Sequence, residues 1–349
     1  SFNSGLDFAL FKNAVQMNVS YYLKHTVDAF MNKRISSVNG QTQYVINSGT
    51  INNSGFSIDA TVSPISTPTF RWTLSASYSK SYNSMETLPG VDQYELEEFL
   101  NGSALTKGHA ISTFWSYRYI GLNPNNGGPV FDDMRDRKYE LVGKSKYDTY
   151  TTVLVPSGQR EPTAQGSFNN TFRYKNFRLG MSLSYSLGSK MRLFSLYSDG
   201  LNFDPERNVN YEMLSRWQRS GDEYRTNIPN IINGSDPESL AYLQHWSLSE
   251  QDNGIQIIAQ NAWDMYDNSD FRVVSGNYLK CSNLSLSYDV PTAKLTKLGI
   301  SMMTATLSTT NLFDISSKKL KNQTPLQSGF ADTKLSERPT WSLSLSVSF

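Results

Sequence analysis

Residues 341–349 read WSLSLSVSF, and this short stretch decides the fold. From Trp341 to Phe349 every odd-numbered residue is apolar and every even-numbered residue is serine. Because successive side chains of a β-strand point to opposite faces, the segment has one wholly apolar face and one wholly polar face. A soluble sheet could use this pattern with its apolar face packed on a core, so the rest of the chain has to decide.

The same alternation recurs along the chain. Serine, threonine and glycine dominate the second face, whereas the outer face of a soluble sandwich would carry more charge. About nine runs of roughly the length that a tilted membrane strand needs predict an all-β chain, a transmembrane antiparallel β-barrel. A chain that ends on an aromatic strand residue is also typical of such barrels. The runs are Leu6–Leu10, Met17–Leu23, Phe56–Val62, Phe70–Tyr78, Phe168–Tyr174, Phe177–Leu187, Leu284–Tyr288, Met303–Phe313 and Trp341–Phe349.

The alternation also assigns the two faces of the wall. Charged side chains are costly against lipid, so the apolar face is predicted to meet the bilayer and the serine face the lumen. The residues expected to face lipid are Leu343, Leu345, Val347, Leu179, Leu183 and Trp72. Those expected to face the lumen are Ser344, Ser346, Ser182 and Ser75. Parity places the single cysteine, Cys281, on the lumen face with Asn283.

Composition excludes other classes of protein. No stretch approaches the roughly 18 apolar residues of a membrane helix, and the mean hydropathy of −0.45 fits strands with one wet face. A net charge of +1 argues against a nucleic-acid partner, which would need a basic stripe. One cysteine cannot form an internal disulfide or a cysteine-rich metal site.

Connections between the runs alternate between short and long. In outer-membrane barrels the short turns face the periplasm, so the long loops 83–161 and 188–270 are predicted to be extracellular. Within the first loop, Phe114–Ile120 and Tyr147–Val155 form either an extracellular hairpin or two further membrane strands. We prefer the hairpin, which gives nine membrane strands, with eleven as the alternative. Because an odd number cannot close a single-chain bacterial barrel, the chain is predicted to be a partial barrel.

The loop 188–270 is too long to lack structure of its own. Two helices are predicted in it. Asp236 and Pro237 supply an N-cap and a first helical residue ahead of Leu240, Leu243 and Trp246. Tyr211, Leu214 and Trp217 also have helical spacing.

Several local strings, in order along the chain, resemble the C-terminal barrel region of SusC/RagA-type TonB-dependent transporters of Bacteroidota. The resemblance covers essentially the whole chain, although each string alone would be weak. The strings are Asn32–Ser37, Ile46–Gly55, Gly121–Gly127, Gly166–Phe177, Arg216–Trp217, Ser269–Lys280, Asn283–Asp289 and Thr310–Phe313.

The resemblance implies an outer-membrane importer of large nutrients, either oligosaccharides or peptides, that acts with a SusD-like surface lipoprotein. It implies a barrel of about 22 strands with an N-terminal plug domain that contacts the TonB complex. Residues 1–349 contain no plug, so they are expected to be the C-terminal portion only, with the N-terminal half and outer-membrane lipid as further partners. The alternative function is a passive porin or barrel scaffold without energy coupling.

The sequence contains no catalytic constellation, so no enzyme, cofactor or metal site is predicted. His25, His109 and His245 lack metal-ligand spacing, and Asp264, Asp267 and Asp270 are interpreted as a solvated acidic turn rather than a Ca²⁺ site. Aromatic residues of the long loops are the best candidates for contacts with a ligand or partner. The competing interpretation is that they pack small loop cores. The candidates are Tyr211, Trp217, Tyr224, Tyr242, Trp246 and Trp263.

Overall fold

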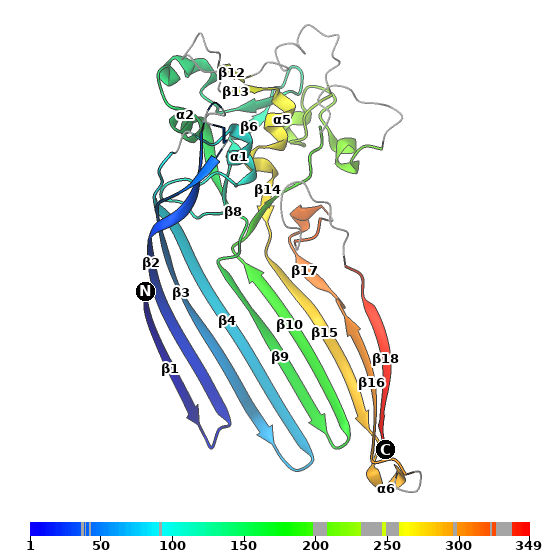
Figure 1. The fold of residues 1–349 in the computed structure, drawn as a ribbon. Helices are drawn as coiled ribbons and strands as arrows, with labels where there is room; N and C mark the ends of the chain where they lie inside the picture. The colour runs from blue at the N-terminus through cyan, green and yellow to red at the C-terminus, as the bar shows by residue number, and fades with distance from the viewer. Residues whose placement is uncertain are drawn as a thin grey trace.

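A computed structural model shows a tall curved sheet with a packed unit of loops at one end (Figure 1). The structure describes residues 1–35, 38, 40–41, 43–90, 93–197, 208–231, 246–248, 258–295, 299–321, 323–325 and 337–349. None of the described helices is long and apolar enough to cross a membrane.

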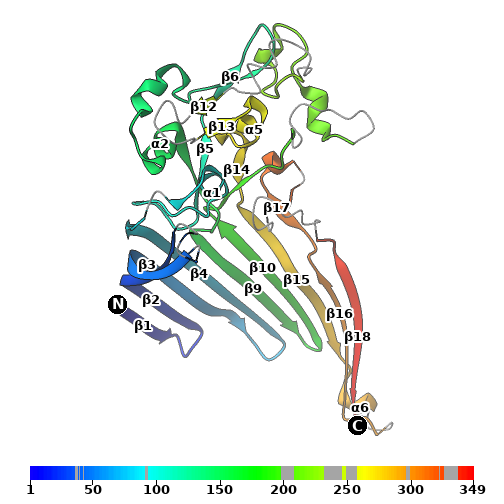
Figure 2. The same ribbon diagram turned by 45° about the horizontal axis from the view of Figure 1, so that its top comes forward.

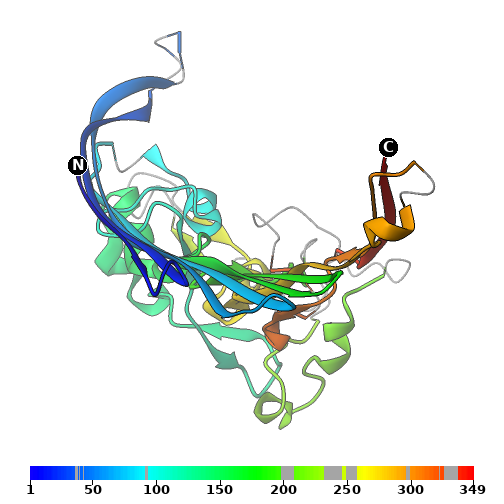
Figure 3. The ribbon, with the colours of Figure 1, turned by 90° about the horizontal axis from the view of Figure 1, so that it is seen from below.

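Nine long antiparallel strands form the sheet in the order β1-β2-β3-β4-β9-β10-β15-β16-β18. This count confirms the nine predicted membrane strands. Seen from below, the sheet is a curved wall whose two ends turn toward the same side (Figure 3). The strands are β1 (Phe2–Leu10), β2 (Val15–Arg34), β3 (Gln43–Ser66), β4 (Phe70–Thr87), β9 (Ala164–Tyr174), β10 (Phe177–Leu187), β15 (Tyr278–Asp289), β16 (Met302–Thr310) and β18 (Thr340–Ser348).

The register arranges the side chains in rows of one kind that cross the sheet. One row is apolar on six strands, and the adjacent row on the other face holds only small polar residues and glycine. The six residues expected to face lipid share one face and the four serines expected to face the lumen share the other, whereas Cys281 departs from its assignment. The apolar row is Leu343, Leu307, Leu286, Leu179, Phe172 and Trp72, and the polar row is Ser342, Ser308, Ser285, Gly180, Thr171 and Thr73.

Each face has its own cross-strand contacts. On the polar face, hydroxyls pair directly: Ser77 Oγ lies 2.9 Å from Ser167 Oγ, and Ser287 Oγ 2.9 Å from Thr306 Oγ1. On the apolar face, the rings of Trp72 and Phe172 stack with their centroids 5.6 Å apart. The apolar face is highly exposed in this chain, at 79% for Leu343 and 60% for Leu345, as a surface covered by lipid would be.

Two predictions about strand extent are corrected. The β2–β3 pair continues to Arg34 opposite Gln43, so these strands extend well beyond the predicted runs Met17–Leu23 and Phe56–Val62. Beyond His25 the register shifts between Thr26 and Phe30, with Asp28 at a φ of +53°, and this irregularity breaks the period of two that a search for membrane strands relies on. The imperfect run Met303–Phe313 is interrupted after β16, and β17 (Asp314–Ser316) continues the pairing along β15.

The predicted position of Cys281 on the lumen face is wrong. The register pairs Cys281 with Leu183 on the apolar face, although Asn283 pairs with Ser182 on the polar face. A bulge causes this change, since the extra residue Ser282 turns its hydroxyl toward Ser184, 2.9 Å away. An inserted residue breaks the period of two, and sequence parity cannot detect it.

The long connections hold the remaining elements, except for α6 in the short connection between β15 and β16, and the eleven-strand alternative is wrong. Phe114–Ile120 contributes to a strand that pairs outside the main sheet, whereas Tyr147–Val155 is mostly helical because Ser145 caps it. The elements are α1 (Leu96–Asn101), β5 (Thr113–Tyr117), β6 (Tyr119–Leu122), β7 (Pro129–Phe131), η3 (Arg135–Leu141), α2 (Lys146–Val153), β8 (Leu154–Gln159), β11 (Lys190–Arg192), η4 (Tyr211–Ser215), η5 (Asp222–Tyr224), β12 (Trp246–Leu248), β13 (Ile258–Gln260), α5 (Ala262–Asp267), η6 (Asp270–Arg272), β14 (Val273–Ser275), α6 (Thr292–Leu295) and η8 (Lys318–Leu320).

The assignment of faces can be tested with neighbouring residues of β18. We expect Leu345→Arg to impair assembly strongly, because a charge near the middle of a bilayer costs about 2–4 kcal/mol on the lipid face. Ser344→Arg should assemble almost normally, since its side chain would enter the lumen. The fraction of protein that migrates as a heat-sensitive folded band measures assembly. Equal assembly of the two variants would contradict the assignment.

Candidate functional site

The two longest connections fold together into one unit at the loop end of the sheet (Figure 2). We call this unit, the described residues of 88–163 and 188–277, the cap. Its core contains aromatic side chains with almost no exposed surface, from segments far apart in the sequence. Arg34 at the end of β2 attaches the sheet to the cap through a two-pronged ion pair with Glu98 of α1, at 2.8 and 2.9 Å. The core includes Phe99, Tyr117, Tyr150, Trp263, Met265 and Tyr266.

A buried arginine joins three segments of the cap. From β11, Arg192 donates through Nη1 to the Leu100 carbonyl at 2.7 Å and to Asn268 Oδ1 at 2.8 Å. Its Nη2 donates to the Trp115 carbonyl at 2.8 Å and to Ser116 Oγ at 2.7 Å. Burial lowers the pKa of Arg192 to about 9, so the guanidinium is still charged at neutral pH. Its planar fork suits several acceptors at fixed angles.

A second buried arginine and a buried aspartate fix the neighbouring segment. Arg272 Nη1 lies 3.2 Å from Glu212 Oε2, and Nη2 donates to the Phe194 carbonyl at 2.6 Å. The Asp267 carboxylate accepts from the backbone N–H groups of Leu196 and Tyr197, both at 2.9 Å. Burial raises the pKa of Asp267 to about 6. The cap is therefore held by charged hydrogen bonds to its backbone as well as by aromatic packing.

The aspartates of the predicted acidic turn have individual structural tasks. Asp267 is only 4% exposed, so the prediction that it is solvated is wrong. Asp270 accepts from the Tyr119 N–H at 3.0 Å, and Asp264 lies in α5, whose N-cap is Asn261. Their oxygens point to different backbone segments and do not converge on one point.

Two of the six candidate contact residues belong to the cap's interior. Trp217 is 5% exposed and its Nε1 donates to Glu223 Oε2 at 3.0 Å. The ring lies against Gly127, whose φ is +70° and where a Cβ would lie 2.3 Å from ring carbons. Trp263 is 1% exposed and donates from Nε1 to the Asn230 carbonyl at 3.2 Å. These two side chains pack the interior of the cap.

Of the other four candidates, two are exposed on the cap surface and two have no described side chain. Tyr211 is 55% exposed and Tyr224 89% exposed, so both are available to a partner. Tyr242 lies outside the described residues, as does the helix predicted after Pro237. The backbone of Trp246 belongs to the short strand β12 and not to a helix.

The helix predicted from Tyr211, Leu214 and Trp217 is reduced to one 3₁₀ turn, η4. Leu214 is 77% exposed, so the three residues do not form one buried apolar face. Trp217 lies beyond the end of the turn, where its N–H donates to the Ile228 carbonyl at 2.9 Å.

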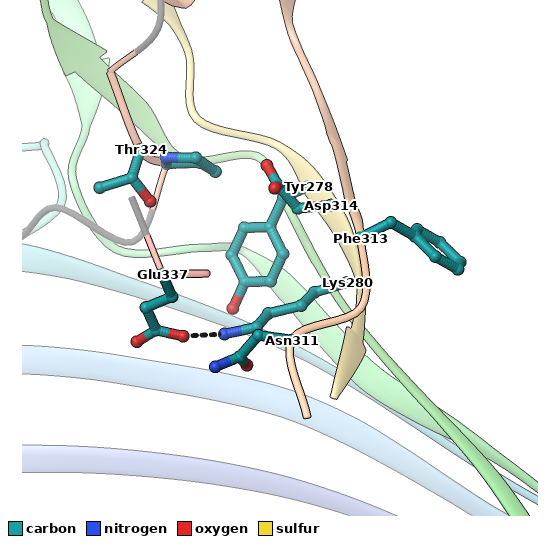
Figure 4. Close-up of a pocket in the computed structure, with 8 residues that line it drawn as sticks. Tyr278, Lys280, Asn311, Phe313, Asp314, Thr324 and Glu337 are labelled. Atoms are coloured by element: carbon teal, nitrogen blue, oxygen red, sulfur yellow. Dashed lines mark hydrogen bonds and ion pairs between the residues drawn. The ribbon is translucent and has the colours of Figure 1, made fainter. Parts of the chain in front are cut away.

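A polar pocket in the wall below the cap was missed by the sequence analysis (Figure 4). Lys280 of β15 forms an ion pair with Glu337, and Tyr278 and Asp314 line the same pocket. Lys280 pairs in register with Ser184, so the pocket opens on the lumen face. By sequence parity Lys280 falls on the face with Leu284 and Leu286, so the available signal was a charged residue on a largely apolar strand face.

Comparisons with known proteins agree on one class. The TonB-dependent receptor P3 of Formosa agariphila is 24% identical over 329 residues, which cover 88% of this chain and 28% of the relative. The TonB-dependent receptor SusC of Bacteroides thetaiotaomicron is 25% identical over 202 residues, 54% of this chain and 19% of SusC. No family model matches the sequence.

Solved structures extend the agreement to the fold. The RagAB peptide importer in its open-open state superposes with a TM-score of 0.73 at 17% identity, over 99% of this chain and 34% of that chain. A second RagAB peptide transporter structure gives 0.72 at 16% identity, over 98% and 34%. This chain thus spans about a third or less of the proteins that it matches.

The fold and its likenesses define a segment of the wall of an outer-membrane β-barrel that is similar to the TonB-dependent receptors. Within that class the resemblance to SusC/RagA-type transporters, predicted from the sequence, is confirmed. The location is accordingly the bacterial outer membrane. The relatives are receptors and transporters, not enzymes.

The role of Arg192 predicts a cap that can be loosened without loss of the wall. Arg192→Met keeps much of the side-chain volume but leaves buried acceptors without a donor, each worth about 1–3 kcal/mol. We expect hydrogen exchange in the cap to rise by one to two orders of magnitude while the strands stay protected. Arg118→Met is the control, because the ion pair of Arg118 with Asp132 is solvent-exposed and worth little. Unchanged exchange in Arg192→Met would show that packing alone holds the cap.

Proposed function

We propose that this chain forms the C-terminal part of the barrel of a TonB-dependent importer of large nutrients, oligosaccharides or peptides. The observation that carries the proposal is the combination of a nine-strand wall with one serine-rich face and a folded cap at one end. A wall of that kind can line a wide aqueous passage, and the cap gives its mouth a shaped surface. The likeness to the RagAB importer over 99% of the chain supports this function.

The wall must be completed by further strands. Within the described residues β1 pairs only with β2 and β18 only with β16, so the sheet has two open edges. Open edges expose unpaired N–H and C=O groups, which a bilayer does not tolerate. We infer that the N-terminal part of the transporter supplies the missing strands and the plug, and that the TonB complex acts through that part.

The lumen face offers contacts to a polar cargo. The wall presents hydroxyls, and the pocket at Lys280, Tyr278, Asp314 and Glu337 adds both signs of charge and an aromatic ring. Such a set can hold the charged groups of a peptide or the hydroxyls and face of a sugar. The choice between these two cargoes depends on surfaces that this chain shares with its partners.

Energy coupling separates this function from its alternative, a passive porin. In the complete transporter, uptake of the nutrient should stop when TonB is deleted or the proton gradient is dissipated. A passive pore would keep transporting under both conditions, because diffusion needs no coupling. Uptake of labelled oligosaccharides and peptides of increasing length measures this and identifies the cargo class. Uptake that continues without TonB would establish the porin.

The cap also provides a surface for the proposed SusD-like lipoprotein. Tyr211, Leu214 and Tyr224 lie within one segment, residues 208–231, and are 55%, 77% and 89% exposed. Exposed aromatic and aliphatic side chains on a rigid support are typical anchors of protein interfaces. We infer that this segment contacts the lipoprotein at the mouth.

Substitution tests this contact. The double variant Leu214→Ser and Tyr224→Ala should reduce co-purification of the lipoprotein at least tenfold, since hot-spot anchors each contribute about 2 kcal/mol or more. Barrel assembly should be unchanged. Tyr139→Ala is the matched control, because Tyr139 is 70% exposed but lies in η3, away from this segment. Equal co-purification of the two variants would place the lipoprotein elsewhere.

A further inference from the structure

A groove on the apolar face of the wall has no task in the transport described above. It lies at the loop end of β4, β9, β10 and β15 and has a volume of about 770 Å³. Side chains of the apolar rows form most of its lining, so it lies on the apolar face of the wall. At the loop end it is completed by Ser275, Asn277, Tyr278, Ser316 and Ser317. We call it the outer-wall groove. Its apolar lining is Tyr78, Phe168, Tyr185, Leu187, Leu279 and Ile315.

A glycine gives the groove its flat aromatic floor. A Cβ at Gly166 would lie 2.0 Å from the Ser77 carbonyl oxygen and 2.5 Å from the Tyr185 hydroxyl. Because Gly166 has none, Tyr185 can lie across β9 and donate to the Ser77 carbonyl at 3.0 Å. Its ring stacks on Phe168 with the centroids 5.3 Å apart and the planes 26° apart. The phenol is thus satisfied within the protein, and the ring offers its flat side outward.

The ammonium group of Lys80 lies on the same face as the groove, next to its lining. Lys80 follows Tyr78 by two residues on the same face and pairs with Ala164, which in turn pairs with Leu187 of the lining. The ammonium lies 5.0 Å from the centre of the Tyr82 ring, which holds it at the rim. In the described part of the chain no carboxylate lies within ion-pair distance of Lys80.

We propose that the outer-wall groove is a binding site for a lipid of the outer leaflet whose phosphate gives its headgroup a net negative charge. An acyl chain lies on Tyr185 and Phe168, and the phosphate meets Lys80. The position fits, since the loop ends of the strands reach the outer leaflet in such barrels. The charge fits as well, because a cation at headgroup depth attracts a phosphate. The site does not depend on what the barrel transports.

The opposite end of the wall supplies matched controls. At the short-turn end, Lys175 stands over Tyr174 at 5.5 Å, as Lys80 does over Tyr82. There Phe177 and Tyr288 pair with their centroids 4.7 Å apart, as Phe168 and Tyr185 do. These residues reproduce the lysine and the ring pair, but they do not line the groove.

Lipid retention by the complete transporter in detergent tests the proposal, with native mass spectrometry as the readout. Vesicle lipids bearing phosphatidylglycerol and phosphatidylcholine serve as the anionic and zwitterionic probes. Lys80→Gln should weaken retention of the anionic lipid about fivefold, the equivalent of about 1 kcal/mol per lysine, and leave the zwitterionic lipid unchanged. Tyr185→Leu should weaken retention of both. Lys175→Gln and Tyr288→Leu should behave like the wild type.

Two results would overturn the proposal. If the groove variants retain lipid as well as the controls do, the bound lipid is merely annular. If excess inorganic phosphate displaces the anionic lipid, Lys80 holds a free anion and the groove is not a lipid site. Heat-sensitive gel migration confirms that each variant is folded, and Tyr185→Phe, which keeps the ring, should retain lipid like the wild type.

Discussion

The structure depends on one constraint, that no backbone N–H or C=O group can be left unpaired inside a bilayer. The wall meets it with an unbroken ladder from β1 to β18. Once the ladder is fixed, so is the register, because a slip by one residue would turn every apolar side chain of that strand into the lumen. The rows that run from Leu343 to Trp72 and from Ser342 to Thr73 are therefore consequences of backbone pairing. Serine suits the polar rows because its hydroxyl can pair with its neighbour across the strands.

Beyond the membrane the same chain follows different rules. Water can hydrogen-bond to the backbone there, so short strands and helices are tolerated. The tertiary structure of the cap must then be stabilised by side-chain contacts of its own. The cap obtains it from aromatic packing and from Arg192, Arg272 and Asp267, which bond to backbone groups of distant segments. The wall has few buried side chains and the cap has many, although both come from one sequence.

How much could be predicted from the sequence follows from this division. Nine strands, their neighbours and their faces were predictable, because a period of two against lipid is a strong local signal. The position of Cys281 was not, since one inserted residue at Ser282 changes the phase. In the cap, Trp217, Trp263 and Tyr224 are all aromatic residues of long loops, so the sequence could not tell which of them are buried. Only the structure shows that the two tryptophans pack the core and that Tyr224 is exposed. The sequence analysis missed the Lys280 pocket because its ion-pair partner, Glu337, is 57 residues away in the chain.

The guanidinium of Arg192 has a consequence for the order of assembly. Its partners lie 76 to 92 residues away; the hairpin of β9 and β10 separates it from Leu100, Trp115 and Ser116, and the rest of the loop 188–270 separates it from Asn268. The strand pairs β4–β9 and β10–β15 of the wall are as distant, at 84 to 111 residues, so both parts depend on long-range contacts that close slowly. The four acceptors meet around the arginine once β4, β9, β10 and β15 are side by side. The strand pairing that builds the wall thus also brings the two long connections together, and the contacts of Arg192 tie the cap to the completed pairing of these four strands.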